Sequence, residues 1–492
     1  MNEREARTEG TLRAWVEVRR GAYHDSVTLM RVSRRVGEVA GVAGAMAAMA
    51  TELNLEMLGR MGFEVPDGAG PADLVVAIRA EDEALDGART ALDDLLRDSR
   101  TAPDGATGLD AAPPARTTGS AARRTEAGIA LVSVPGPHVF PEAMDALDAG
   151  LNVMVFSDNV PVEQEVALKE AAARRGLIVM GPDCGTAVVG GAGLGFANAV
   201  RPGPVGLVAA SGTGAQQVMC LLDEAGVGVS HALGVGGRDL SPEVSGRSAL
   251  AALAALDADP ATELIIVVSK PPAPRVADLI REAARRLDTP VEFAFPGPED
   301  DLTRATERAL VRLGREVPQW PEGHPGADPP TAPGTVRGLF SGGTLKAEAE
   351  AILRAELGED LAARGHSLID YGDDAYTQGR AHPMIDPTLR LEAIREQAAA
   401  SPRGVLFLDV VLGYGADPDP GGPLFPLLGE VLDEHRELRA VVSLCGTRQD
   451  PQGFERHMDG FLDAGAAVFL SNARAARHAA ELVGTPGDRG TE

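Results

Sequence analysis

From Gly128 onward, short continuous runs of apolar residues alternate with amphipathic segments. Runs without polar alternation, separated by amphipathic helices, are typical of parallel strands that helices cover on both faces. The pattern therefore predicts a doubly wound α/β sheet. The apolar runs are IALVSV, LNVMVF, LIVMG, VGLVAA and ELIIVVS, and the expected helices span 141–149, 161–175 and 214–225.

The same alternation returns after residue 334, and it predicts a further domain of the same class. Its apolar runs are VRGLFSG, SLIDYG, VLFLDVV, LRAVVSL and AAVFLS, with helices expected at 344–356, 387–399 and 423–434.

The N-terminal part alternates strands and helices over a shorter length, and we expect a small α+β domain there. The expected strands are 14–19, 43–50 and 73–80, and the expected helices are 26–39, 53–61 and 84–96.

Two segments contain many Pro, Gly and small polar residues and almost no large apolar ones, as linkers do. They divide the 492 residues into three folded parts, and a norm of roughly 150 residues per domain suggests three or four domains, the longer middle part holding two. The predicted linkers are 99–126 and 316–334, and the predicted domains are 14–98, 127–200, 201–315 and 335–485.

The chain carries 46 basic and 72 acidic side chains and a formal net charge of −26. Nucleic acids and anionic membranes require clustered Lys and Arg, so neither is expected as a partner. We expect small anionic substrates to be captured locally, by helix N-termini, backbone N–H groups or a few arginines, against this unfavourable field.

Three cysteines without a CxxC motif form neither a disulfide framework nor a tetrahedral zinc site. No apolar stretch of about 20 residues and no signal-type N-terminus is visible, so a cytoplasmic location is expected.

The sharpest candidate for chemistry is the turn Ser211-Gly212-Thr213-Gly214, between an apolar strand and a helix. Hydroxyls and N–H groups at a helix start form a cradle for phosphate or carboxylate. The alternative is ordinary N-capping with glycines for close packing. The position after a buried strand favours the anion site.

Three other glycine turns follow strands. In Gly236-Gly237-Arg238, the arginine is suited to bidentate binding of an anion, and the alternative is a surface ion pair with Asp239. The turn Ser341-Gly342-Gly343-Thr344 opens a helix. In Gly181–Thr186 we interpret Cys184 as a small packed residue, because no base is evident to activate it.

The segment 371–387 has many polar groups after a strand. Arg380 and His382 are candidates to bind a carbonyl or phosphoryl oxygen, and the pair Asp373-Asp374 could hold Mg²⁺. The alternative is a simple helix start, with Asp386 as N-cap followed by a proline.

The run from Ile129 to Pro272 resembles the α-subunit of succinyl-CoA synthetase, and more closely its FdrA relatives. The segment from Val336 onward resembles the ligase-type domain of the β-subunit, and the N-terminal part fits the extra domain of FdrA. The motifs that carry the resemblance are AWVEVRRGAYHDSVTLM, ALVSVPGP, NVMVFSDNV, MGPDCGT, ASGTG, GVGGRDLS, VVSKPP, FSGGTL, IDYGDDAYTQGRAHPMIDP and LFLDVVLGYGA.

The resemblance implies a CoA-binding-like Rossmann domain at 127–200 and a flavodoxin-like domain at 201–315. It assigns Ser211, Gly212 and Thr213 to a phosphate-binding helix start. It places Gly236-Gly237 beside the active-site loop. It makes Gly342-Gly343-Thr344 the start of a helix that faces a transferred phosphoryl group. CoA and Mg²⁺ remain alternatives, and no cofactor is firmly predicted.

The departures from the family pattern concern the phosphate relay. The stretch VEFAFPGPEDD lacks the histidine that takes up phosphate, and Lys270 replaces the glutamate that would steady it. An ammonium attracts an anion, whereas a carboxylate orients a phosphohistidine ring. The glycine-rich turn of the usual CoA domain and an ATP-grasp domain are also missing from the pattern.

Resemblance to FdrA implies oxamate carbamoyl transfer from carbamoyl phosphate in purine and allantoin nitrogen catabolism, in a hetero-oligomer with partner subunits and without a phosphohistidine. The catalytic residues would then be Lys270, Arg380 and His382: Lys270 would join the Ser211 turn at the phosphate, and Arg380 and His382 would polarise the carbonyl. Arg238 would clamp a carboxylate. One alternative is an ADP-forming acyl-CoA or succinate-CoA ligase subunit. Another is a non-catalytic scaffold or regulatory subunit.

Overall fold

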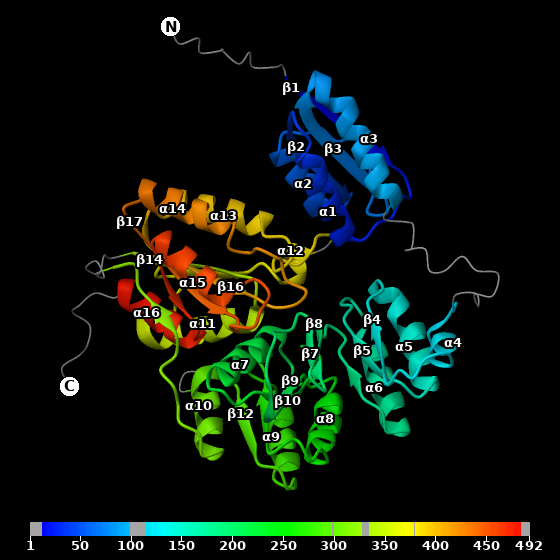
Figure 1. The fold of residues 1–492 in the computed structure, drawn as a ribbon, viewed down its shortest axis with the longest axis vertical. Coiled ribbons are helices and arrows are strands. Elements are labelled where there is room, and N and C mark those ends of the chain that lie inside the picture. Colours follow the sequence, from blue (N-terminus) through cyan, green and yellow to red (C-terminus); the bar gives the residue numbers. More distant parts are fainter. Residues whose placement is uncertain (1–11, 99–114, 298–299, 327–333, 378, 484–492) are drawn as a thin grey trace. The chain divides into compact units, whose positions relative to one another are not determined.

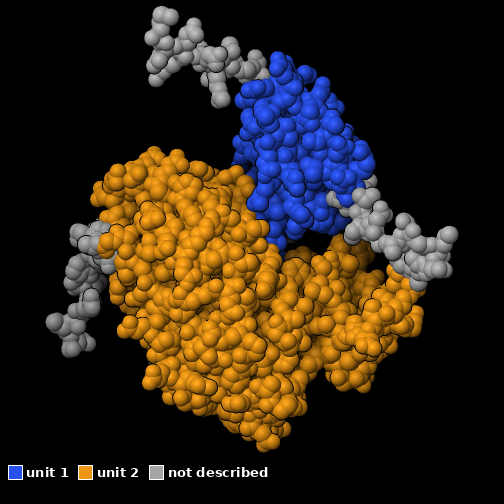
Figure 2. Space-filling model, in the orientation of Figure 1, with its two compact units in different colours: residues 1–113, 372–386 blue, residues 114–371, 387–492 orange. Residues whose placement is uncertain are grey.

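The computed structural model describes residues 12–98, 115–297, 300–326, 334–377 and 379–483. The chain forms two compact units, coloured separately in Figure 2. Unit 1 comprises residues 1–113 and 372–386, and unit 2 comprises residues 114–371 and 387–492. Residues 372–386, which follow a strand of unit 2 in the sequence, therefore belong to unit 1.

Unit 1 is built on a three-stranded antiparallel sheet in the order β1-β3-β2 (Figure 1). Alternate residues of β3 enter two clusters: Val76 and Ile78 pack with α1 and α3, whereas Val75 and Ala77 pack with the segment that contains α2. A period of two places these sets on opposite faces, so both faces of the sheet are covered. The elements are β1 Leu12–Arg19, α1 Ser26–Gly37, β2 Val42–Met49, α2 Glu52–Arg60, β3 Leu74–Glu81, α3 Asp82–Asp98 and α12 Asp374–Thr377.

Unit 2 contains one three-stranded parallel sheet and two six-stranded sheets. The small sheet has the order β4-β5-β6, and its elements are α4 Thr118–Ala122, β4 Ile129–Val132, the 3₁₀ turn η1 Gly136–His138, α5 Val139–Asp148, β5 Asn152–Val155, α6 Val162–Arg175 and β6 Val179–Met180.

The first six-stranded sheet has the order β12-β11-β9-β10-β7-β8. Its elements are β7 Thr186–Val189, β8 Ala192–Gly195, β9 Pro202–Ala209, α7 Gly212–Glu224, β10 Val229–Gly234, α8 Arg247–Asp257, β11 Leu264–Val268, α9 Pro274–Ala284, β12 Val291–Ala294 and α10 Leu302–Arg312.

The second six-stranded sheet has the order β13-β18-β17-β16-β14-β15. Its elements are β13 Glu322–Gly323, β14 Thr335–Phe340, α11 Gly343–Leu357, β15 Ser367–Asp370, α13 Thr388–Ala400, β16 Arg403–Val411, α14 Leu424–Glu434, β17 Glu437–Cys445, α15 Phe454–Asp463, β18 Ala466–Phe469 and α16 Asn472–Val483.

Both six-stranded sheets share one arrangement at their centre. β9 lies between β10 and β11, and β14 lies between β15 and β16, with parallel pairing throughout. In each sheet, the strand that follows β9 or β14 in sequence is therefore added on one side of it, and the next parallel strand is added on the other side. Doubly wound proteins bind ligands at such switch points, beyond the carboxyl ends of the strands.

The structure confirms the predicted fold class, with doubly wound domains and a small N-terminal α+β domain. Some details depart from the expected pattern. The β7–β8 hairpin pairs antiparallel with β10, so a segment placed by sequence in domain 127–200 joins the next sheet. Strand β13 lies inside the predicted linker 316–334, and α4 inside the predicted linker 99–126. Residues 99–114 of that linker lie outside the described residues.

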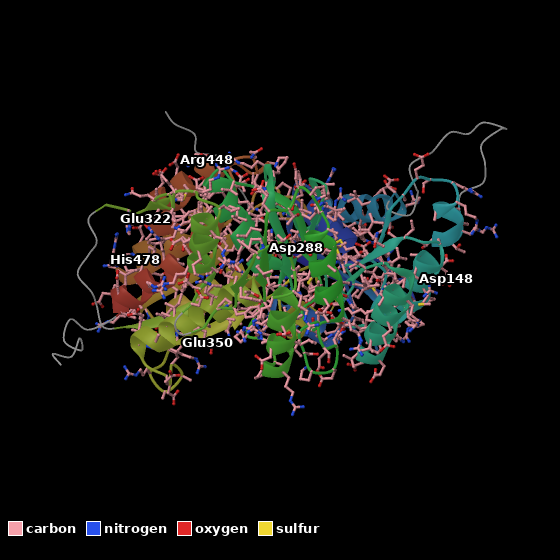
Figure 3. All side chains as sticks on the ribbon, turned by 90° about the horizontal axis from the view of Figure 1, so that it is seen from below. Asp148, Asp288, Glu322, Glu350, Arg448 and His478 are labelled. Atoms are coloured by element: carbon pink, nitrogen blue, oxygen red, sulfur yellow. The ribbon has the colours of Figure 1, made fainter. Side chains whose placement is uncertain are left out.

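Many charged side chains of unit 2 lie on its outside, where Figure 3 labels several of them. Many are paired, as Glu350 is with Lys346 and Arg354, and Arg448 with Glu224. Exposed pairs of this kind contribute little to stability. Within the described residues, no helix has the length and apolar character needed to cross a membrane.

Candidate functional site

Two of the predicted turns meet inside unit 2. The Ser211 turn ends β9 and opens α7, and the Ser341 turn ends β14 and opens α11 (Figure 1). Ser211 Oγ donates to Thr344 Oγ1 over 2.6 Å, and both side chains are buried. The two switch points and the N-terminal ends of two helices therefore face each other.

Close backbone approach at this junction requires a glycine. A Cβ atom at Gly342 would lie only 2.8 Å from Thr213 Oγ1. A Cβ at Gly214 would lie 3.0 Å from Thr344 Cγ2. The glycines singled out from the sequence thus allow two helix starts to come within van der Waals distance of each other's side chains.

A lysine and an aspartate reach the first residue of α11. A Cβ atom at Gly343 would lie 2.7 Å from Lys270 Nζ and 2.5 Å from Asp370 Oδ2. Lys270 follows β11 and is exposed, and Asp370 ends β15. The sequence identified Lys270 but not Asp370, although the position of Asp370 at a strand end was a usable signal.

A buried carboxylate fixes the turn that opens α11. Asp409 accepts from Ser341 N and Gly342 N at 2.7 Å each, and from Ser341 Oγ at 2.9 Å. Arg390 lies 3.3 Å from this carboxylate and donates to the Asp409 carbonyl over 2.6 Å. Burial lowers the pKa of Arg390, while the negative charge of Asp409 acts in the opposite direction. Sequence reasoning missed both residues; a single Asp in the apolar run VLFLDVV was the available signal.

The hydroxyl of Ser211 also caps its own helix, because Ser211 Oγ accepts from Gly214 N over 3.0 Å. The N-capping alternative is therefore realised. It leaves the other first-turn N–H groups of α7 without partners inside the helix, as at any helix start. Phosphate binding by Ser211, Gly212 and Thr213 stays a prediction.

The second turn is held by ion pairs. Arg238 lies 3.0 Å from Glu165 Oε2 and donates to Val160 O over 2.8 Å. Asp239 pairs instead with Lys169, at 2.6 Å, in a buried position. The alternative of a surface ion pair between Arg238 and Asp239 is thus not realised.

Two glycines precede Arg238 in this turn. A Cβ atom at Gly236 would lie 2.3 Å from Pro182 O, and Gly237 is exposed. These contacts explain the turn structurally, and a role for Gly236, Gly237 and Arg238 in substrate binding stays a prediction.

Arg380 and His382 belong to unit 1, whereas the Ser211 turn, Lys270 and Thr344 belong to unit 2. Arg380 Nη2 contacts Met57 Sδ, and His382 Nδ1 accepts from the N–H of Met384 over 3.2 Å. A neutral imidazole that accepts at Nδ1 carries its proton on Nε2. Action of both residues on the substrate stays a prediction.

Other features of this segment are local. Asp373 Oδ1 accepts from Ala375 N over 3.0 Å, at the start of α12. Helix α13 begins at Thr388 with Pro387 in the N-cap position, so the alternative of a helix start with Asp386 as N-cap is not realised. Among the residues that the structure describes, no group of three His, Cys, Asp or Glu side chains could hold a metal ion.

Cys184 is buried, and burial raises the pKa of its thiol to about 12. Such a thiol is protonated at neutral pH and is a poor nucleophile. This supports the interpretation of Cys184 as a packed residue.

The sheet order, the paired switch points and the paired helix starts define a protein of the CoA-ligase class. Two family models match it: the AllF heavy metal-associated domain over residues 12–112, and the CoA-ligase domain over residues 339–482.

The uncharacterized protein YahF of Escherichia coli K12 is 36% identical over 514 residues, which cover 95% of this chain and 98% of YahF. The chain belongs to the FdrA family, within the succinyl-CoA synthetase superfamily.

More distant relatives match a smaller part. The succinate–CoA ligase [ADP-forming] subunit alpha 2 of Archaeoglobus fulgidus is 28% identical over 215 residues, covering 40% of this chain and 75% of the subunit. A dinucleotide-forming acetyl-coenzyme A synthetase 1 from Ca. Korarchaeum cryptofilum overlaps with a TM-score of 0.30 at 15% identity, covering 77% of this chain and 86% of the synthetase chain.

Proposed function

We propose that the chain binds the phosphate of a small activated substrate where the N-termini of α7 and α11 meet. The observation that carries the proposal is the convergence of two helix starts and Lys270 at the switch points of two sheets. Helix N-termini attract anions through their partial positive charge and unpaired N–H groups, and Lys270 adds a full charge. A strongly acidic protein needs such a local concentration of donors to hold an anion.

Group transfer at this site would proceed without a phosphohistidine. Between His231 and His324 the sequence contains no histidine, and Lys270 replaces the glutamate of the ligase relay. A pre-activated donor removes the need for that relay. In the reaction that FdrA resemblance implies, the amide nitrogen of oxamate attacks the carbamoyl carbon of carbamoyl phosphate. The bond from this carbon to the bridging oxygen breaks, the nitrogen loses a proton, and inorganic phosphate leaves.

The remaining candidate residues have roles in this reaction. Arg380 and the Nε2–H of His382 would donate to the carbamoyl oxygen, where charge develops. Arg238 would hold the carboxylate of oxamate. Lys270 and the Ser211 turn would hold the leaving phosphate. We further propose that the chain works in the cytoplasm with partner subunits.

A second candidate function is that of an acyl-CoA or succinate-CoA ligase subunit. It is favoured by the CoA-ligase match over residues 339–482 and by the identity to a succinate–CoA ligase α-subunit. This function would require CoA and nucleotide binding by the assembled enzyme. A non-catalytic scaffold would show no affinity for any of these ligands.

Ligand-dependent thermal shifts distinguish these functions. The full chain is heated alone and with carbamoyl phosphate, inorganic phosphate, oxamate, CoA or ATP. A ligand at about 100 times its Kd stabilises the native state by ~2.7 kcal/mol. We expect carbamoyl phosphate and phosphate to raise the Tm, and CoA and ATP to leave it unchanged. Shifts with CoA or ATP alone would favour the ligase, and no shift with any ligand would favour the scaffold.

A further inference from the structure

Unit 1 does not have the residues that its family description implies. The matching model describes a heavy metal-associated domain, and soft metal ions prefer thiolate ligands, with thioether and imidazole groups as further ligands. The three cysteines of the chain are at positions 184, 220 and 445, all outside unit 1. Unit 1 contains two histidines: the side chain of His24 is buried, and His382 Nδ1 accepts from the N–H of Met384. Unit 1 therefore offers no thiolate, and its described residues contain no group of three His, Cys, Asp or Glu side chains that could hold a metal ion, so its residues do not fit the metal that the description implies.

A segment of the same chain is bound to this unit instead. Asn54 of α2 is 1% exposed. Its Nδ2 donates to Met49 O and to Gly379 O, at 2.9 Å each. One buried amide therefore joins α2 both to the end of β2 and to a segment 325 residues away in sequence.

Two further contacts come from the same side of α2. Thr51, Asn54 and Met57 are spaced by three residues, a spacing that places side chains on one helical face. A Cβ atom at Gly379 would lie 2.6 Å from Thr51 Cγ2, and Gly379 has φ = +71°, which favours glycine. Arg380 contacts Met57 Sδ. The face of α2 therefore fits the backbone of this segment closely.

We infer that the face formed by Thr51, Asn54 and Met57 holds residues 379–386 in place, and that this is the task of unit 1 in place of metal binding. Asn54 is a positioning residue: it fixes the Gly379 carbonyl, next to Arg380 and close to His382. The consequence for catalysis rests on the proposed function, because it requires Arg380 and His382 to act on the substrate. The inference that residues 379–386 are held in place does not depend on the proposed function.

Hydrogen exchange of the full chain tests this without any ligand. The peptide over 379–386 is compared with a peptide from β3, which reports on the stability of unit 1 as a whole. In Asn54→Ala and in Gly379→Ala, exchange of the 379–386 peptide should rise about tenfold. Exchange of β3 should stay near the wild-type rate. Gly21→Ala is the matched control, because Gly21 has φ = +63° in the same unit but no atom within 4 Å of an added Cβ.

Wild-type exchange of the 379–386 peptide in both Asn54→Ala and Gly379→Ala would overturn the inference. If β3 also exchanges faster in Asn54→Ala, that variant has destabilised unit 1 as a whole. Exchange of the 379–386 peptide in Gly379→Ala then tests the inference, because this variant leaves the buried amide of Asn54 intact. Zinc(II) and copper(I) are then added separately to the wild-type chain. We expect no change in exchange within residues 12–98, and stoichiometric protection there would overturn the exclusion of metal. Loss of phosphate binding in the thermal-shift experiment would contradict the proposed function but leave these results unchanged.

Discussion

Thr213 is the residue of the Ser211 turn whose side chain can add a bond to a bound phosphate. Its Oγ1 lies near Gly342, at the point where the two helix starts meet. Thr213→Ala should weaken phosphate and carbamoyl phosphate binding by ~1.5–3 kcal/mol, the value of a hydrogen bond to a charged group. Gly212→Val should abolish binding, because its side chain would block the close approach of phosphate to the backbone at the helix start; it would also crowd Thr186 Oγ1, which lies 3.1 Å from a Cβ at this position. Titration calorimetry measures both effects.

A suitable control is Thr335→Ala, which removes a hydroxyl at the amino end of β14, away from the junction. Thr335 is hydrogen-bonded to Ser401 over 2.8 Å, so the control also breaks one side-chain bond. Wild-type affinity in Thr213→Ala and Gly212→Val would place the phosphate site elsewhere.

Glu348 makes the stability of unit 2 depend on pH. Its carboxylate is buried, and accepts from Leu302 N at 2.6 Å and from Asn472 Nδ2 at 2.7 Å. Burial, together with the charge of Asp301, raises the pKa of Glu348 from 4.5 to about 7, although Arg477 acts in the opposite direction. The folded state thus retains the proton more tightly than the unfolded state does. This stabilisation is complete below about pH 4.5 and is lost as the pH rises through about 7.

Replacing Glu348 by Gln removes this titration and keeps a side chain of the same shape. Between pH 5 and pH 8, the wild type should lose about 3 kcal/mol of unfolding free energy that Glu348→Gln does not lose. The measurement is the difference between the two urea midpoints at several pH values. Glu350→Gln is the control, because Glu350 lies on the same helix in a less buried position. Parallel curves for wild type and Glu348→Gln would contradict the pKa of Glu348.

At the scale of elements, most of the fold could be predicted because strands and helices have local signatures. Apolar runs and amphipathic spacing predict β9, α7, β14 and α11, and glycine turns mark where they join. The β7–β8 hairpin was not predicted, because both strands are short, lack a long apolar run, and are joined at a glycine pair that is followed by further glycines in β8. Asp370 and Asp409 were missed although a strand end and a single Asp in an apolar run marked them, because strand order brings each beside the α11 turn and the local pattern does not give that order.

The segment 371–386 is the element with the strongest prediction about catalysis. If His382 donates to the reacting carbonyl, its removal should cost ~2.7–4 kcal/mol in the barrier, or about 10²–10³ in kcat. His382→Ala should show this loss in the assembled enzyme and keep phosphate binding.

The structure offers a matched variant for this test. His382→Asn keeps a side-chain acceptor for the N–H two residues later, as Asn does in turns, but removes the Nε2–H donor. Both variants should lose kcat to a similar extent if His382 is a donor. If His382→Asn turns over normally while His382→Ala does not, the ring has a structural role and the catalytic assignment is wrong.

At the scale of unit 2, buried polar bonds join the two six-stranded sheets well beyond the candidate site. Thr303 Oγ1 and Ser471 Oγ are 2.7 Å apart, and Asn198 Nδ2 donates to Asp450 Oδ2 over 2.8 Å. Buried polar groups left without partners are costly, so such bonds favour one arrangement of the two sheets. The pairing of the Ser211 and Ser341 turns is therefore a property of the whole unit. Each turn could be predicted from sequence, but their meeting could not, because it depends on contacts between residues more than a hundred positions apart.

This joint arrangement leads to the prediction that unit 2 forms no phosphohistidine. The stretch in which the relay histidine is expected contains no histidine, and Lys270, which replaces the glutamate of the relay, reaches the beginning of α11. A lysine ammonium there attracts a phosphate dianion but does not orient an imidazole for phosphorylation. The chain is incubated with γ-labelled ATP, or with succinyl-CoA and labelled phosphate, alone and with partner subunits. We expect no acid-labile, base-stable label on this chain, while a succinyl-CoA synthetase α-subunit treated in parallel becomes labelled. Stable label on a histidine of this chain would show that a relay exists, and Lys270→Glu would then be expected to increase it.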